Sequence, residues 1–275
     1  MTAPVLEVRG LEVALGHRRA RRTVLHDVSF VIEPGATLGL VGESGSGKTT
    51  TGRAIAGLVR PASGSILLDG HDVSRERWWR RPGGGTLQVV FQDPYSSMNP
   101  ALRVEDILRE PLRTLRLPRA EARRRSEEML ARVGLPVAAL DRYVAAFSGG
   151  QRQRLAIARA LVSRPRVIVC DEAVSALDLS VQAQVLNLLK DLQEELGIAY
   201  LFIGHNLDVV EFMSHRIAVL YEGRVVESGD AAEVLRRPTH AYTRRLVSAI
   251  LSPDPREQAR RRALVTATPT QEGPS

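Results

Sequence analysis

Mostly apolar runs of four to six residues recur along this chain, and glycine or polar residues end each of them. They lie at residues 36–41, 87–91, 167–170 and 198–203. Such short runs without alternation are typical of strands buried on both faces of a parallel sheet. The pattern predicts an α/β core in which the carboxyl ends of these strands meet at one edge of the sheet.

Other segments have strand character but lie outside this predicted core. These segments are residues 5–13, 28–32, 65–68, 216–221 and 224–227. The first three form an N-terminal β-rich part that flanks the first core strand, and the turn Asp69-Gly70 follows them. The last two are joined by Glu222-Gly223, which predicts a hairpin.

Between residues 92 and 148 the periodicity changes to that of helices. We expect helices over residues 104–117 and 119–133, the second closed by Gly134. A further helix is expected to begin at Ser180 as its N-cap and to end at Gly197. Its apolar residues share one face, which we interpret as core packing; they are Val181, Val185, Leu188, Leu192 and Leu196.

A glycine-rich turn separates the first buried run from a predicted helix that reaches Ala56. Its residues are Gly42, Glu43, Ser44, Gly45, Ser46, Gly47, Lys48 and Thr49, with Thr50 opening the helix. In a loop of this spacing, backbone N–H groups surround phosphates, the lysine reaches the β and γ oxygens, and the next hydroxyl ligates Mg²⁺. A chance match in a Gly/Ser-rich turn is the alternative, and the strand–loop–helix order disfavours it. Lys48 is also one of only two lysines, against 36 arginines.

A second glycine-bearing turn opens another predicted helix, with the residues Ser148, Gly149, Gly150 and Gln151. Ser148 can cap this helix, and the exposed amides of the first turn favour an anion. One nucleotide site needs only one phosphate loop and one such turn. We therefore expect two copies, placed head to tail, to close two sites, each with the loop of one copy and the turn of the other.

Polar residues follow the other three core strands. Gln92 follows the second run, Asp171 and Glu172 end the third, and His205 follows the fourth. Asp171 can hold Mg²⁺, and Gln92 can reach either Mg²⁺ or the attacking water through its amide oxygen. Glu172 can polarise that water. Alone, each has a simpler interpretation as a solvated acid, a surface glutamine or a structural histidine. Because these residues follow a phosphate loop in this order along the chain, we favour the catalytic interpretation of all of them.

With these motifs the chain resembles the nucleotide-binding domain of ABC transporters, over roughly residues 5–250. The resemblance implies Walker A at residues 42–49, the Q-loop at Gln92 and the signature at residues 147–151. It also implies Walker B at Asp171 and Glu172, the D-loop at residues 175–178 and the switch histidine at His205. ATP and Mg²⁺ are the expected cofactors, and ATP hydrolysis is the expected reaction.

The resemblance also implies the fold class, which is α/β. We expect a P-loop NTPase core of ABC type with an N-terminal antiparallel β part and an inserted helical subdomain at about residues 93–165. The nucleotide-binding domain would cover residues 1–250. Residues 251–275 contain several prolines and few apolar residues, so we expect a disordered tail.

Three segments narrow the class further, at residues 91–100, 171–178 and 240–243. They resemble the ATP-binding subunits of bacterial oligopeptide/dipeptide importers, a group that also serves nickel and some sugar systems. The implied partners are a second ATP-binding subunit, identical or related, transmembrane permease subunits, and indirectly an extracytoplasmic solute-binding protein. Because the permease and the binding protein choose the cargo, the solute cannot be predicted from this chain.

The chain departs from the family pattern at several positions. Phe147 opens the signature where many members have leucine, a packing change that we expect to be silent. Leu15 stands where many members have a ring that stacks on adenine, and His17 is the only ring nearby. Asn206 replaces the usual aspartate after His205, and we expect this change to alter the activity without abolishing it. Cys170 is the single cysteine, so the C-terminal iron–sulfur cluster of some members cannot form.

Composition places limits on location and partners. The net charge of +7 comes from arginines scattered along the chain, and no base-reading motif accompanies them, so we expect no nucleic-acid partner. No apolar run approaches the roughly 20 residues that cross a bilayer, and the first residues lack a signal-peptide pattern. We expect a peripheral protein at the cytoplasmic face of the inner membrane, held there by its partners.

Two other functions share these motifs. A soluble ABC ATPase that acts on ribosomes or DNA is the main alternative, although such proteins usually fuse two of these domains or insert a long coiled coil. A regulatory nucleotide-binding module without turnover is disfavoured by Glu172.

Overall fold

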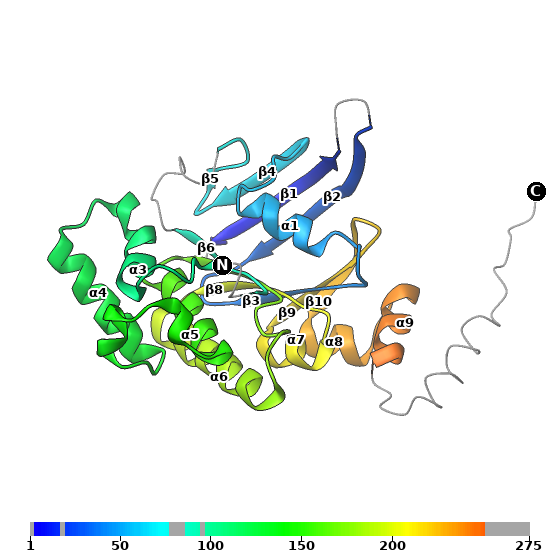
Figure 1. Cartoon of the computed structure of the whole chain (residues 1–275). Helices are drawn as coiled ribbons and strands as arrows, with labels where there is room; N and C mark the ends of the chain where they lie inside the picture. The colour runs from blue at the N-terminus through cyan, green and yellow to red at the C-terminus, as the bar shows by residue number, and fades with distance from the viewer. Residues whose placement is uncertain (1–2, 17–19, 77–85, 94–96, 251–275) are drawn as a thin grey trace, which may run out of the picture.

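A computed structural model describes residues 3–16, 20–76, 86–93 and 97–250 (Figure 1). Its larger sheet has six strands in the order β10-β9-β3-β8-β7-β6. These are β3 (Thr37–Val41), β6 (Leu87–Val90), β7 (Val167–Asp171), β8 (Ala199–Ile203), β9 (Arg216–Tyr221) and β10 (Arg224–Asp230). Neighbouring strands are parallel, except that β10 runs antiparallel to β9. The predicted parallel core and the predicted hairpin are therefore confirmed.

The N-terminal part forms a second, antiparallel sheet of four strands in the order β2-β1-β4-β5. Its strands are β1 (Leu6–Leu15), β2 (Arg22–Ile32), β4 (Ser63–Leu68) and β5 (His71–Asp72). Figure 1 shows it as a layer of its own above the larger sheet. Leu6, Leu25 and Ile66 on this sheet share one hydrophobic core with Leu40 and Leu201 on the parallel sheet. Burial of these residues joins the two sheets into one fold.

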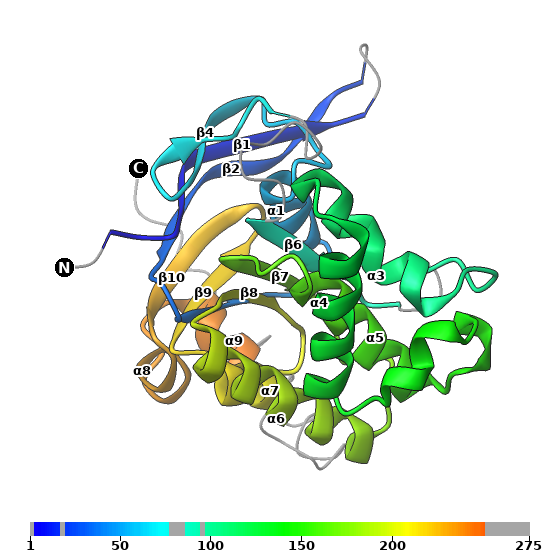
Figure 2. The same cartoon turned by 90° about the vertical axis from the view of Figure 1, so that its left-hand side faces the viewer.

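The other face of the parallel sheet is covered by all but one of the helices, which Figure 2 shows from a second side. The helices are α1 (Lys48–Ile55), α3 (Val104–Leu112), α4 (Arg119–Arg132), α5 (Gly149–Leu161), α6 (Leu179–Leu196), α7 (Leu207–Met213), α8 (Ala231–Arg236) and α9 (Ala241–Ile250). Short 3₁₀ turns span Arg113–Leu115, Val137–Asp141 and Val144–Ala146. Of these helices α1 alone packs toward the antiparallel sheet, since Ala54 and Ile55 belong to the core between the sheets. None of the helices in the described ranges combines the length and the apolar character needed to cross a membrane.

Two predicted helix boundaries are wrong. The helix expected over 104–117 ends at Leu112 and continues as a 3₁₀ turn, because Pro111 lies inside its last turn and Arg116 has a left-handed φ of 50°. The helix expected to be capped by Ser180 begins two residues earlier, at Leu179. Asp178 is its N-cap and accepts a hydrogen bond from the Val181 N–H at 2.9 Å.

The segment between β6 and β7 contains α3, α4 and α5, which lie together at one side of the molecule in Figures 1 and 2. Its limits at residues 93 and 165 as a helical subdomain stay a prediction. The expected tail at 251–275 and His17 lie outside the described residues. Cys170 is buried in β7, as its apolar strand predicted, and burial raises the pKa of its thiol to about 12.

Candidate functional site

The glycine-rich loop connects the buried end of β3 to α1 and is tightly packed on one side. Gly42 has a φ of 153°, and a Cβ at this position would lie 2.1 Å from the backbone oxygen of Leu220 in β9. Gly45 has a φ of 82°, but a Cβ there would meet no atom within 4 Å. Both positions need the conformational freedom of glycine, and only Gly42 also needs its lack of a side chain.

These two glycines give a matched pair for testing how the loop is packed. We expect Gly42→Ala to lower the free energy of unfolding by about 1–3 kcal/mol more than Gly45→Ala, because only the first change forces a carbon against backbone. Chemical denaturation of both variants measures the difference. Equal losses would show that the contact with Leu220 relaxes without cost.

Lys48 begins α1 and reaches back across the loop. Its Nζ donates hydrogen bonds to the carbonyl oxygens of Gly42 at 2.7 Å and of Glu43 at 2.9 Å. The residue is buried, and this burial lowers the pKa of the ammonium, against the opposing effect of the Glu172, Asp171 and Glu43 carboxylates. The lysine is thus a desolvated cation held at the mouth of the loop, close to the acids that end β7.

Thr49 and Asp171 come together between α1 and β7. The Thr49 hydroxyl donates to Asp171 Oδ1 at 3.2 Å. Asp171 is only 8% exposed, and burial raises the pKa of its carboxyl, while the bond from Thr49 opposes that shift. A hydroxyl and a buried carboxylate are oxygen donors of the kind Mg²⁺ prefers, and a cation there would offset the cost of burying the acid. These residues therefore fit a magnesium ion.

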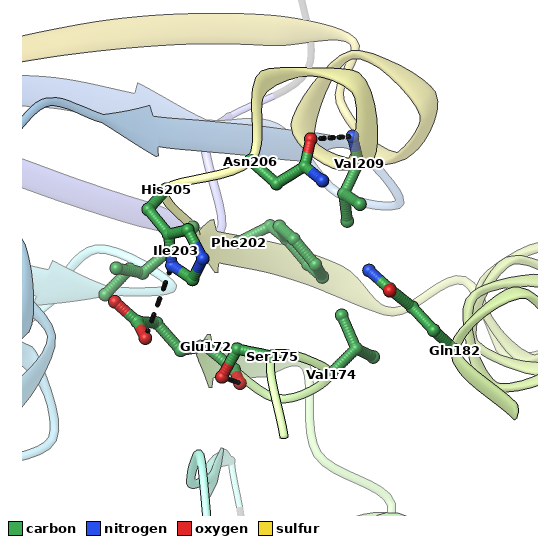
Figure 3. A pocket seen from close by; sticks show the side chains of 10 residues that line it. Glu172, Val174, Ser175, Gln182, Phe202, Ile203, His205, Asn206 and Val209 are labelled. Carbon is green, nitrogen blue, oxygen red and sulfur yellow. Dashed lines mark hydrogen bonds and ion pairs between the residues drawn. The ribbon is translucent and has the colours of Figure 1, made fainter. Parts of the chain in front are cut away.

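Glu172 and His205 face each other across the ends of β7 and β8 (Figure 3). Glu172 Oε2 lies 3.5 Å from His205 Nδ1. The Glu172 backbone has a left-handed φ of 51°, and its N–H donates to the Ile203 carbonyl at 2.9 Å. This uncommon backbone conformation for a residue with a side chain turns the carboxylate out of the strand direction and toward the histidine.

A cavity of ≈ 140 Å³ opens beside this pair, and Gln182 of α6 points into it in Figure 3. Its lining also includes Val174, Ser175, Phe202, Asn206 and Val209. Asn206, which replaces the usual aspartate, is the N-cap of α7: its side-chain oxygen accepts from the N–H groups of Asp208 and Val209 at 3.0 and 3.4 Å. An asparagine caps a helix as well as an aspartate does, so the helix end is preserved without the charge.

Gln92 lies just beyond β6, the neighbour of β7, and is exposed. Within the described part of the chain, no hydrogen bond joins its side chain to Thr49 or Asp171. The structure therefore places Gln92 at the expected edge of the sheet, without a hydrogen bond to Thr49 or Asp171 among the described residues.

The second glycine-bearing turn forms the N-terminus of α5, as predicted. Ser148 and Gln151 make a capping box, in which each side chain bonds the backbone N–H of the other residue at 3.4 and 3.1 Å. A Cβ on Gly150 would lie 2.7 Å from a methyl of Val181 in α6. The turn is thus preformed and pressed against α6, and both capping residues are exposed to solvent.

One residue in contact with the loop was not identified from the sequence. The hydroxyl of Tyr242, in α9, accepts a hydrogen bond from the N–H of Glu43 at 2.8 Å. Residues 240–243 were singled out only as a family motif, and nothing in their spacing indicates a contact with a loop 199 positions away.

Two family models match the sequence. One, described as ABC transporter, matches residues 25–175, and the other, described as oligopeptide/dipeptide transporter, C-terminal region, matches residues 226–274. A peptide import ATP-binding protein of Brucella ovis is 47% identical over 274 residues, which are 98% of this chain and 86% of that protein. The glutathione import ATP-binding protein GsiA of Salmonella typhi is 47% identical over 272 residues, and the match covers 96% of this chain but 44% of GsiA.

Solved structures with the same fold include two ATP-binding cassettes. The first is cbiO1 from Clostridium perfringens, part of the ABC transporter complex cbiONQ, with a TM-score of 0.74 and 28% identity over 94% of this chain and 99% of that chain. The second is a dimeric ATP-binding cassette in a post-hydrolysis state with ADP and Pi, with a TM-score of 0.70 and 27% identity over 82% of this chain and 98% of that chain.

Proposed function

This chain belongs to the ABC transporter ATP-binding family, and from that premise we propose that it is the ATP-hydrolysing subunit of a bacterial importer for peptides or a related solute. The fold is the P-loop NTPase fold of ABC type, and the activity is that of an ATPase. The observation that carries the proposal is the identity of 47% to a peptide import protein along 98% of the chain. The relatives give no support to a soluble ATPase that acts on ribosomes or DNA.

In the proposed reaction, the γ-phosphate of ATP is transferred to water. The amides of residues 43–50 and the Lys48 ammonium would neutralise the charge that spreads over the phosphate oxygens in the transition state. Thr49 and Asp171, with Gln92 reaching in from β6, would hold Mg²⁺, which when bound offsets the negative charge on the β- and γ-phosphates.

Glu172 is the proposed general base. Its carboxylate is only 22% exposed and would accept a hydrogen bond from the attacking water. His205, 3.5 Å away, would keep the carboxylate oriented and contact the γ-phosphate side. Water attacks in line with the bond to the leaving oxygen, and the proton passes to Glu172.

In this proposal, the site of one subunit is complete only when a second ATP-binding subunit supplies its own exposed turn at Ser148. Ser148, Gly149, Gly150 and Gln151 of one subunit would then meet the γ-phosphate bound by the other, where the N-terminus of α5 favours negative charge. ATP would hold the two subunits together, and hydrolysis would release them. The partner is either a second copy or a related subunit.

Permease subunits and an external solute-binding protein complete the proposed complex, and the chain would lie at the cytoplasmic face of the inner membrane through the permease. Purification of the tagged chain from detergent-solubilised membranes tests this. We expect a multi-span permease to co-purify, and the same complex carrying Glu172→Gln to assemble without transporting solute. Recovery of ribosomes or DNA in place of a permease would contradict the proposal.

Recognition of the base gives a separate prediction. Leu15 ends β1 with 40% of its surface exposed and is paired with Arg22 on β2. If it forms the adenine platform, GTP should be hydrolysed at a rate near that of ATP, and Leu15→Tyr should add up to about 1–3 kcal/mol of ATP binding through stacking. Titration with fluorescent nucleotides measures this.

Leu58 is a suitable control site, because this exposed leucine follows α1 and lies outside the loop. Leu58→Tyr should leave nucleotide affinity unchanged. A strong preference for ATP that Leu15→Tyr does not alter, and that His17→Ala abolishes, would assign the stacking position to His17.

A further inference from the structure

Both ends of one peptide group in the phosphate loop are held by side chains. The carbonyl oxygen of Gly42 accepts a hydrogen bond from Lys48 Nζ at 2.7 Å. The N–H of Glu43 donates to the hydroxyl of Tyr242 at 2.8 Å. These two polar groups belong to the same planar unit, so a constraint on one end fixes the direction of the other.

Tyr242 itself is firmly held. It is 2% exposed, and the centroid of its ring lies 4.2 Å from that of Tyr221 at the end of β9. Its backbone N–H donates to Nδ1 of His240 at 3.2 Å, at the start of α9. Burial raises the pKa of its hydroxyl, so at neutral pH the group accepts the bond from Glu43 as a neutral phenol.

The helix that carries Tyr242 is tied to the sheet through Glu227 of β10. This carboxylate accepts hydrogen bonds from the N–H groups of Thr239 at 2.7 Å and His240 at 3.0 Å and from the Thr239 hydroxyl at 2.8 Å. Burial acts to raise the pKa of Glu227, but the hydrogen bonds from Thr239 and His240 outweigh it and hold the pKa at about 2, so the anchor stays charged at neutral pH.

Two other contacts, both from the turn between β9 and β10 and the strand before it, support the loop. The Leu220 carbonyl backs Gly42, and the Gly223 N–H in the hairpin turn donates to the Ser46 carbonyl at 3.0 Å. Three of the supporting residues, Leu220, Gly223 and Tyr242, lie beyond the stretch 25–175 that matches the ABC transporter model. The loop is therefore shaped in part by the C-terminal part of the chain, and of these three residues Tyr242 is the one that acts through its side chain.

We propose that Tyr242 is a positioning residue for ATP: its hydroxyl fixes the Gly42–Glu43 peptide and so places the Lys48 ammonium for the phosphates. The inference rests on the proposed function, because it takes the loop to hold Mg-ATP. Without the hydroxyl, the peptide can rotate, and the lysine loses an acceptor of fixed position. Ground-state binding of ATP should suffer, whereas the chemical step at Glu172 should not.

Tyr242→Phe tests this, because it keeps the ring against Tyr221 and removes only the oxygen. We expect KM and Kd for Mg-ATP to rise about 3- to 10-fold, as for one lost hydrogen bond, with kcat within about 2-fold of the parent. Amide hydrogen exchange in residues 42–48, measured without nucleotide, should become faster. Tyr221→Phe is the matched control, since it removes a hydroxyl from the other ring of the stack, and it should behave like the parent.

Several results would overturn the inference. For Tyr242→Phe, these results are an unchanged KM, a fall in kcat at constant KM, or unchanged amide exchange in the loop. For Tyr221→Phe, the result is a rise in KM as large as that of Tyr242→Phe. The exchange measurement needs no ATP, so it decides the positioning role even if the parent were to bind no nucleotide. A parent that neither binds nor hydrolyses ATP would instead refute the proposed function.

Discussion

Glu172→Gln is expected to bind Mg-ATP like the parent, to accumulate as an ATP-bound dimer, and to hydrolyse ATP about 10²–10⁴-fold more slowly. The substitution preserves the size of the side chain and removes the charge that would polarise water. Lys48, Thr49 and Asp171 are untouched, so the phosphates keep their ligands. Glutamine can adopt the left-handed backbone of this position about as well as glutamate can, so folding should not change.

Phosphate release and size-exclusion chromatography with Mg-ATP measure the two effects. Glu211→Gln is the matched control, because it removes the same charge from α7, where Glu211 pairs with Arg236 at the surface. It should hydrolyse ATP like the parent. Parental turnover in Glu172→Gln would remove Glu172 from the mechanism. A failure to dimerise, both alone and with a related subunit, would argue against ATP as the link between subunits.

Ser148→Arg is expected to abolish ATP-dependent dimerisation and turnover while leaving ATP affinity of the single chain within about 2-fold of the parent. The arginine would fill the space that the partner's γ-phosphate needs, and its charge is unfavourable at the N-terminus of α5. Sizing with Mg-ATP in the Glu172→Gln background, together with nucleotide titration of the monomer, separates the two effects.

The capping box makes a control necessary here. Ser148 accepts the Gln151 N–H, so any replacement that loses this bond costs about 1 kcal/mol of helix stability. Ser148→Ala loses the cap but leaves the space open, and it should still dimerise. If Ser148→Arg weakened ATP binding by the monomer as strongly as it weakened dimerisation, the turn would belong to the site of its own chain.

Features encoded by neighbouring residues were predictable from the sequence. The continuous apolar run before Asp171 specifies a strand buried on both faces, and the glycine spacing before Lys48 specifies the loop. The meeting of Thr49 with Asp171 follows from these two elements once β3 and β7 are parallel strands of one sheet, on either side of β8. Local chemistry and one topological rule were enough for this part of the site.

Features that depend on competition or on distant contacts were not predictable. The sequence predicts Ser180 as the cap of α6, but Asp178 caps this helix in the structure. Pro111 ended a helix whose apolar pattern continued beyond it. The bond from Tyr242 to Glu43 depends on how β9, β10 and α9 return to the loop, and no short-range pattern encodes such a return.

The phosphate loop depends on contacts from β9, β10 and α9, and this dependence sets an order of events during synthesis. The phosphate loop leaves the ribosome early, but the hydroxyl that orients it is 199 residues further along, and the hairpin that supports Ser46 also comes late. Contacts of such long sequence separation form slowly and after local structure. A nascent chain that already has Lys48 and Asp171 therefore still lacks the support that shapes its loop. The site is complete only when α9 has left the ribosome and packed against the rest of the chain. A chain shortened from its C-terminus should therefore lose nucleotide binding before it loses its fold.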